Sequence, residues 1–279
     1  MSTLTQTPPA APRAKARRRR WPLQGRLLAV YTWLVIIWLF MPIGVMILFG
    51  FNNPRGRYNN TWQGFTLKWY GRVFDIPDLT NALVTSLVIA LLTMLIAGTI
   101  GTMIGMALGK YRFRGQATTN LVMFAAISSP EIVMGASLLS MIVSIGQNPG
   151  FVWILVAHVM FSVSFVAVTV RARVMTLDPA MEEAARDLGA GTWTTFRLVT
   201  LPMIFPGVMA GALLAFALSV DDFVITNFVS GGTTTFPLWI WGATKVGIPP
   251  QVNVMGTLIF GGGLLLAVGN ALVARRRNA

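Results

Sequence analysis

Long apolar stretches separated by short polar segments organise this 279-residue chain. A transmembrane helix requires about 20 predominantly apolar residues, and six stretches of the chain have that length. They therefore predict an all-α integral membrane protein, with a first span set apart from a five-helix core over residues 81–274. The predicted spans cover residues 27–51, 81–109, 117–145, 151–170, 204–229 and 252–274.

Two local patterns refine this picture of the spans. The second span carries small residues at every fourth position, namely Ala97, Gly101, Gly105 and Gly109. Such a stripe lets another helix approach closely, so we expect tight helix packing along it. The third span is interrupted at Ser129-Pro130-Glu131. A serine N-cap followed by a proline is typical of a helix start, which predicts a break midway through this span.

The polar segments between the spans indicate the orientation of the chain. Residues 1–20 are rich in Pro, Ala and Arg and are expected to form a disordered tail, and 275–279 form a second basic tail. With the N-terminus inside, seventeen of the 22 Lys and Arg residues fall on the cytoplasmic side. The positive-inside rule then places both termini and the loop 171–203 in the cytoplasm, and the loop 52–80 outside.

Composition supports a membrane protein and excludes several kinds of site. Hydrophobic residues make up 54% of the chain and charged residues 11%, whereas soluble domains carry about 25% charged residues. The absence of cysteine excludes disulfides and thiolate metal sites, and a single histidine, His158, leaves no zinc cluster. The net charge of +13 is concentrated at 13–26 and 275–277, beside the spans. That location favours anionic lipid headgroups over nucleic acid.

One charged segment, residues 178–202, stands out inside the apolar core. Asp178-Pro179 is a typical helix start and Gly189 a typical helix end. Between them, small and apolar residues recur with helical spacing, and Glu182 and Arg186 lie one turn apart, where they form a weak pair. We expect a second short helix from about residue 193 that stops near 201–202. The narrow apolar face consists of Met181, Ala184, Ala185 and Leu188, and predicts docking into a groove of another protein.

These residues resemble the EAA loop of ABC importer permeases. The resemblance rests on Glu183-Ala184-Ala185, on Gly189 and on Val199-x-Leu201-Pro202, with Val where Ile is usual. It implies the type I ABC importer permease fold and a coupling helix that docks on a cytoplasmic ATPase subunit. The coupling residues that it implies are Glu183, Ala184, Ala185, Gly189, Leu201 and Pro202.

Three acids within the predicted spans are the candidates for a substrate pathway: Glu131, Asp221 and Asp222. A charged side chain near the bilayer centre costs at least ~2.5 kcal/mol on insertion, so its presence suggests a site that faces a pathway or is paired. Adjacent helix positions point about 100° apart, which leaves open which aspartate faces the pathway. Alternatively, both hold the structure together, for example against Lys245. Acids without intramembrane Lys or Arg favour a cationic substrate.

His158 has two interpretations. The first is an interhelical hydrogen-bond donor, because polar side chains within spans usually bond to a neighbouring helix. The second places it on the substrate pathway. No acid or nucleophile stands at related spacing, so the sequence predicts no catalytic group at this histidine.

A finer resemblance covers about residues 27–274 and points to PotC-type permeases of spermidine/putrescine ABC importers. It departs at the Arg-rich N-terminus and at Glu131, where such permeases have Asp. It implies three kinds of partner: a PotB-like second permease, two PotA-like ATPase subunits and an extracytoplasmic PotD-like binding protein. It is carried by residues 110–115, 219–223, 228–231, 237–238 and 245–247.

The chain itself has no nucleotide-binding signature. No G-x-x-x-x-G-K-[ST] is present, and Gly261-Gly262-Gly263 lies inside a span. We therefore expect a non-catalytic subunit without a cofactor, with ATP and Mg on the partner ATPases, in the inner membrane. Two alternatives remain open: a permease for another small cationic or amino-acid-derived solute, and an ion-coupled secondary transporter that uses the same acids. The second leaves the loop 171–203 without a purpose.

Overall fold

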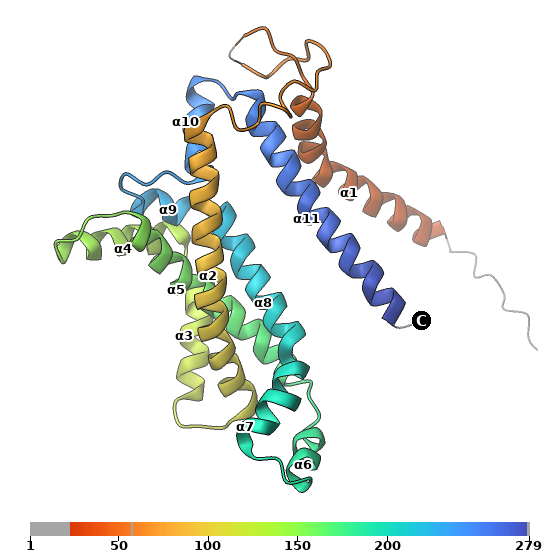
Figure 1. Ribbon diagram of the computed structural model, residues 1–279, viewed down its shortest axis with the longest axis vertical. Coiled ribbons are helices and arrows are strands. Elements are labelled where there is room, and N and C mark those ends of the chain that lie inside the picture. The colour runs from red at the N-terminus through yellow and green to blue at the C-terminus, as the bar shows by residue number, and fades with distance from the viewer. Residues whose placement is uncertain (1–22, 57, 278–279) are drawn as a thin grey trace, which may run out of the picture.

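The computed structural model describes residues 23–56 and 58–277, and within them the regular structure is helical apart from one isolated bridge between Asn52 and Phe65. Figure 1 shows an elongated bundle with α6 and α7 at one end and α10 at the other. The predicted tail 1–20 lies outside the described residues. The elements are α1 Leu23–Gly50, α2 Pro77–Lys110, α3 Gln116–Ser128, α4 Glu131–Ser144, α5 Phe151–Val174, α6 Ala180–Asp187, α7 Thr192–Thr195, the π-helical turn η1 Phe196–Thr200, α8 Leu201–Asp221, α9 Val224–Val229, α10 Phe236–Val246 and α11 Pro250–Arg277.

Helices α2, α5 and α8 form the centre of the bundle, and the small-residue stripe of α2 lies against α5 as predicted. A Cβ built on Gly101 would lie 2.6 Å from the Cβ of Val166, and one on Gly105 would lie 2.6 Å from the carbonyl oxygen of Ala167. Only glycine therefore permits this separation of the two backbones. The prediction of tight helix packing along the stripe is confirmed.

In the described part of the chain, four helical stretches are long and apolar enough to cross a membrane: Gly25–Gly50, Pro77–Lys110, Phe151–Val174 and Thr192–Asp221. The pair α3 and α4 counts as a fifth if it forms one broken span. Helix α11 covers the sixth predicted span, and its 28 residues exceed the about 20 that a span requires. The predicted all-α membrane fold is thus confirmed, while the predicted C-terminal tail begins within a helix that continues to Arg277.

The predicted interruption of the third span is present, and α3 and α4 are bent by 102° at it. Ser129 is not the N-cap of α4: its hydroxyl donates to the carbonyl of Ala125 in the preceding helix, at 2.8 Å. Pro130 occupies the N-cap position with extended backbone angles. Proline disfavours a helical conformation at the residue before it and removes a donor, so α3 ends here and α4 starts in a new direction.

The fifth predicted span differs from expectation at both of its ends. It begins earlier, because α7, η1 and α8 form a continuous helical stretch over Thr192–Asp221 with no stop at residues 201–202. It also ends earlier, because Asp222 adopts extended backbone angles and separates α8 from α9. The expected single helix over 204–229 is therefore wrong. The sequence did not reveal the break at Asp222 because neither glycine nor proline marks it.

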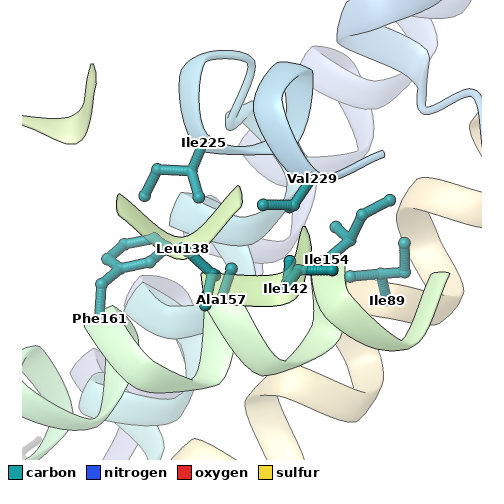
Figure 2. Packing of buried hydrophobic residues seen from close by; sticks show 8 residues of the cluster. All are labelled: Ile89, Leu138, Ile142, Ile154, Ala157, Phe161, Ile225 and Val229. Atoms are coloured by element: carbon teal, nitrogen blue, oxygen red, sulfur yellow. The ribbon is translucent and has the colours of Figure 1, made fainter. Parts of the chain in front are cut away.

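A buried hydrophobic cluster positions the short helix α9. Figure 2 shows Ile225 and Val229 of α9 facing side chains from α4, α5 and α2. Gly135 of α4 permits close contact, because a Cβ there would lie 2.6 Å from the ring of Phe228. The packing of α9 against α4, α5 and α2 thus stabilises the helix break that follows α8. The remaining members of the cluster are Ile89, Leu138, Ile142, Ile154, Ala157 and Phe161.

Helices α1 and α11 pair with each other to one side of the central bundle (Figure 1). The apolar side chains of α1 are largely exposed from Leu27 to Val45. A soluble protein would not expose a contiguous apolar surface of this size, whereas a bilayer accommodates it. Because α1 is paired with α11, which belongs to the predicted core 81–274, the division into a first span and a five-helix core stays a prediction.

Candidate functional site

The predicted helix of the charged segment is present as α6. The carboxylate of Asp178 accepts a hydrogen bond from the backbone N–H of Ala180 at 3.0 Å, and so caps the helix start. Gly189 follows the helix with φ of +85°, and the N–H of Ala190 donates to the carbonyl of Ala185 at 3.0 Å. This is a Schellman-type helix end, which confirms both predicted ends of the helix.

The outer face of α6 is open. Glu183, Ala184 and Gly189 are exposed, and Leu188 has a relative exposure of 90%. Trp193, at the start of the next short helix, is also exposed. The predicted apolar face is therefore largely available for contact with another protein, although Ala185 is half-buried.

The inner face of α6 carries Glu182, whose role the sequence did not indicate. Lys110, at the end of α2, donates to both carboxylate oxygens of Glu182, at 2.7 and 2.5 Å. The hydroxyl of Thr200 donates to the same carboxylate at 2.7 Å. The expected pair with Arg186 is present at 3.9 Å, but it is the weaker contact. The signal in the sequence was the basic residue that ends α2, 72 positions away.

These contacts keep Glu182 ionised. Burial alone would raise its pKa, but the hydrogen bonds from Lys110 and Thr200, with the charges of Lys110 and Arg186, lower it below the ordinary value. A cleft of about 400 Å³ lies beside this ion pair, between α6 and the ends of α2 and α5. Its polar lining consists of Lys110, Asp178, Glu182, Glu183, Arg186 and Thr200.

Leu201 and Pro202 lie directly after the π-helical turn η1, in which the N–H of Leu201 donates to the carbonyl of Phe196. A proline has no N–H, and its ring clashes with the carbonyl four residues earlier. A wider turn before Pro202 relieves that clash and lets the helix continue into α8. This is why the expected stop at residues 201–202 does not occur.

Of the three candidate pathway acids, Glu131 and Asp221 are exposed and Asp222 is buried. Glu131 is the first residue of α4, where the helix dipole favours a negative charge. Asp221 is the last residue of α8 and lines a groove of about 500 Å³. The aromatic side chains in the lining of that groove are Phe223, Phe236, Trp241 and Phe260.

Asp222 belongs to a buried polar network centred on His158. Nε2 of His158 lies 3.2 Å from the Asp222 carboxylate and 2.9 Å from the hydroxyl of Thr226, and Nδ1 lies 2.7 Å from the hydroxyl of Ser219. Asp222 also accepts hydrogen bonds from the N–H and the hydroxyl of Thr226, at 2.8 and 2.6 Å. The network joins α5, α8 and α9 across the helix break.

This geometry decides the interpretation of His158. It bonds to neighbouring helical segments, as the first interpretation expected. The sequence spacing showed no acid or nucleophile beside it, whereas the structure brings Asp222 and Ser219 to it from more than 60 positions along the chain. Lys245 lies over the ring of Trp241, and no ion pair joins it to Asp221 or Asp222 in the described part of the chain.

One end of the bundle presents an open helix face, and acids stand at two helix junctions. Among the described residues, no group of His, Asp and Glu side chains has the arrangement of a metal site. The class of protein defined by this fold is a multi-pass α-helical membrane protein.

Comparisons with known proteins assign the family. Residues 101–277 match the family described as "Binding-protein-dependent transport system inner membrane component". The chain is 38% identical to the "Spermidine/putrescine transport system permease protein PotC" of Escherichia coli strain K12, over 90% of this chain and 93% of the relative. It is 36% identical to the "Putrescine transport system permease protein PotI" of the same organism, over 80% of this chain and 82% of the relative.

Solved structures share the fold. A bacterial ABC transporter for import of the acidic polysaccharide alginate has a chain that aligns with a TM-score of 0.65 at 16% identity, covering 94% of this chain and 99% of the other. A bacterial alginate ABC transporter in complex with its pentasaccharide-bound periplasmic protein aligns with a TM-score of 0.62 at 17% identity, covering 90% and 92%. The chain belongs to the family of inner membrane components of binding-protein-dependent transport systems, the permease subunits of ABC importers. It is a multi-pass inner membrane protein.

Proposed function

We propose that this permease forms half of the translocation pathway of an ATP-driven importer of polyamines. The observation that carries the proposal is the 38% identity to PotC, which extends over nearly the whole of both chains. The groove lined by Asp221 supports it, because a carboxylate among aromatic rings suits organic ammonium groups. Glu131 and Asp221 are the acids that attract the substrate, and Asp222 supports the wall of the pathway beside them.

The proposal includes an orientation and a set of partners. Both termini and the loop 171–203 lie in the cytoplasm, where α6 docks on one of two PotA-like ATPase subunits that bind ATP and Mg. A PotB-like permease completes the pathway, and a PotD-like protein delivers substrate from outside. Closure of the ATPase pair moves α6 and converts the spans from inward-facing to outward-facing. The coupling residues are Glu183, Ala184, Ala185, Gly189, Leu201 and Pro202.

Uptake by proteoliposomes that contain the complete transporter tests the substrate. Radiolabelled putrescine or spermidine accumulates with ATP and the binding protein, and Asp221→Asn lowers uptake about tenfold, the effect of losing an interaction worth about 1.4 kcal/mol. Asp75→Asn removes the same charge from an exposed position outside the spans and is the matched control. Uptake that continues with an ion gradient and no ATP would identify a secondary transporter instead.

Cysteine labelling tests the orientation, because the natural chain has no cysteine. Leu188→Cys and Asp75→Cys place one thiol at each end of the bundle, and the permease is expressed without its ATPase so that α6 is uncovered. A membrane-impermeant maleimide added to intact spheroplasts should label Asp75→Cys and leave Leu188→Cys unlabelled until the cells are lysed. Labelling of Leu188→Cys in intact cells would place α6 outside and overturn the proposal.

A further inference from the structure

Glu182 is the contact through which α6 is joined to the membrane-spanning helices. Its side chain is 16% exposed and accepts hydrogen bonds from Lys110 at the end of α2 and from Thr200 at the end of η1. Lys110 and Thr200 belong to two different spans, so one carboxylate ties the coupling segment to both.

The two neighbouring glutamates of α6 differ in their exposure and in their partners. Glu183 is exposed at the edge of the cleft between α6 and the spans, which suits contact with another protein. Glu182 lies about 100° further around the helix, is half-buried, and borders the same cleft where it is bonded to the spans. A helix that is displaced by a bound partner can pass the displacement to the spans only through side chains that are bonded to those spans.

Thr200 adds a second reason to place a mechanical contact at this point. It is buried and is the last residue of the π-helical turn, a geometry that is often found at functional sites. Its hydroxyl donates to Glu182, in a different segment of the chain. Glu182 thus binds the chain directly before the long helix α8, at the turn η1 where the hydrogen-bond pattern departs from that of a regular α-helix.

Lys110 shares one oxygen of the Glu182 carboxylate with Thr200 and also binds the second oxygen. Lys110 is the last residue of α2, and the glycines of α2 allow this helix to pack closely against α5. A displacement of Glu182 is consequently transmitted to the α2–α5 pair as well as to α8. Because both hydrogen bonds involve an ionised carboxylate, they are stronger and shorter than bonds between neutral groups.

We propose that Glu182 is a positioning residue that transmits the movement of α6 to α2 through Lys110 and to α8 through Thr200. The inference rests on the proposed coupling function and adds to it a defined route, separate from the face that docks on the ATPase. Loss of this contact uncouples ATP hydrolysis from transport while the ATPase subunits stay bound.

Charge reversal in the complete transporter tests the route. Lys110→Glu and Glu182→Lys each place like charges together, and the double variant restores an opposite pair with reversed polarity. In proteoliposomes with putrescine or spermidine, each single variant is expected to lower substrate transported per ATP hydrolysed about tenfold, and the double variant to recover at least half of the loss. The substrate concentration for half-maximal uptake stays unchanged, because the substrate pathway is not altered.

Asp187→Asn is the matched control, since Asp187 is an exposed acid on the same helix. Co-purification of the ATPase and thermal unfolding of each variant accompany the transport assay. Glu182→Gln is the milder variant if a charge reversal prevents folding, and it should lower the transport-to-hydrolysis ratio two- to fivefold.

Three outcomes would overturn the inference. The single variants could transport as much per ATP as wild type, the double variant could be no better than either single one, or Glu182→Gln could release the ATPase and so assign Glu182 to docking. Failure of the proposed function would look different, because wild-type proteoliposomes would then show no ATP-dependent polyamine uptake. In that case the proposed route through Glu182 would also lose its basis.

Discussion

The two ends of α8 are held by the same combination of groups in opposite surroundings. At its start, the carboxylate of Glu182 binds Lys110 and the hydroxyl of Thr200. At its end, the carboxylate of Asp222 contacts His158 and accepts from the hydroxyl of Thr226. Each set therefore consists of an acid, a basic side chain and a threonine, and each marks a place where regular α-helix is interrupted.

The two sets differ in their access to solvent. The side chains of His158 and Asp222 are 1% and 4% exposed, whereas those of Lys110 and Glu182 are 28% and 16% exposed. Removing one partner from a buried network leaves the others unsatisfied, which costs more than the bond itself was worth. A partly exposed ion pair can separate, because water replaces the lost contacts. We infer that the buried set fixes the helix break and that the exposed set permits movement.

The largest expected effect comes from Asp222→Ala. It leaves the N–H and the hydroxyl of Thr226 without their acceptor and removes one partner of His158, and an unsatisfied buried group costs about 1–3 kcal/mol. The free energy of unfolding of the purified chain, measured by denaturant titration in detergent, should fall by this amount. Asp221→Ala is the control, because Asp221 is exposed and should change the free energy by less than about 0.5 kcal/mol. Equal losses for the two variants would contradict the proposed contrast between them.

A smaller loss is expected for His158→Leu. Asp222 keeps its two bonds from Thr226, so the helix break survives with one partner fewer and the unfolding free energy falls by about 1–2 kcal/mol. His158→Gln retains a donor and should recover part of this loss. If Gln and Leu destabilise the protein equally, the hydrogen bonds of His158 do not carry the effect.

Glu182→Gln should cost less than either buried substitution, about 0.5–1 kcal/mol, because an accessible ion pair is partly screened. High salt should weaken the same contact in the wild-type protein and leave the buried network unaffected. Hydrogen exchange of the α6 amides with and without added salt measures this. Salt-independent exchange of α6, together with salt-sensitive exchange near Asp222, would reverse the comparison.

The smallest expected effect is that of low pH, which should weaken the contact between Glu182 of α6 and the spans. The pKa of Glu182 is lower in the folded protein than in the unfolded chain, so its contribution is fully present above the ordinary value of 4.5. It is lost as the pH falls through that value towards the folded pKa. Hydrogen exchange of α6 at pH 7, 5 and 4 should show wild type approaching the Glu182→Gln variant, which lacks the titrating group.

The sequence predicted those parts of the fold that local pattern controls. Asp178 and Gly189 bound α6 because a capping side chain and a left-handed glycine act over a few residues. The stripe containing Gly101 and Gly105 likewise predicted where α2 meets another helix. These features require no knowledge of distant segments.

The missed features depend on contacts between distant segments. The residues around Asp222 read as continuous helix, and the break is stabilised by His158, 64 positions earlier. Glu182 has Arg186 within its own helix, yet its stronger partner is Lys110, 72 positions away. At Ser129-Pro130 the sequence predicted an interruption but not the 102° angle between α3 and α4, which accompanies the packing of α4 against α9.

The glycine contacts between α2 and α5 connect the two helices that hold the polar contacts at the start and at the end of α8. Lys110 belongs to α2 and His158 to α5, and these helices meet closely at Gly101 and Gly105, where a Cβ would lie 2.6 Å from an atom of α5. We therefore expect α2 and α5 to move together, and a displacement of α8 relative to this pair to be taken up at the widened turn before Pro202, where the hydrogen-bond pattern departs from the regular α-helix.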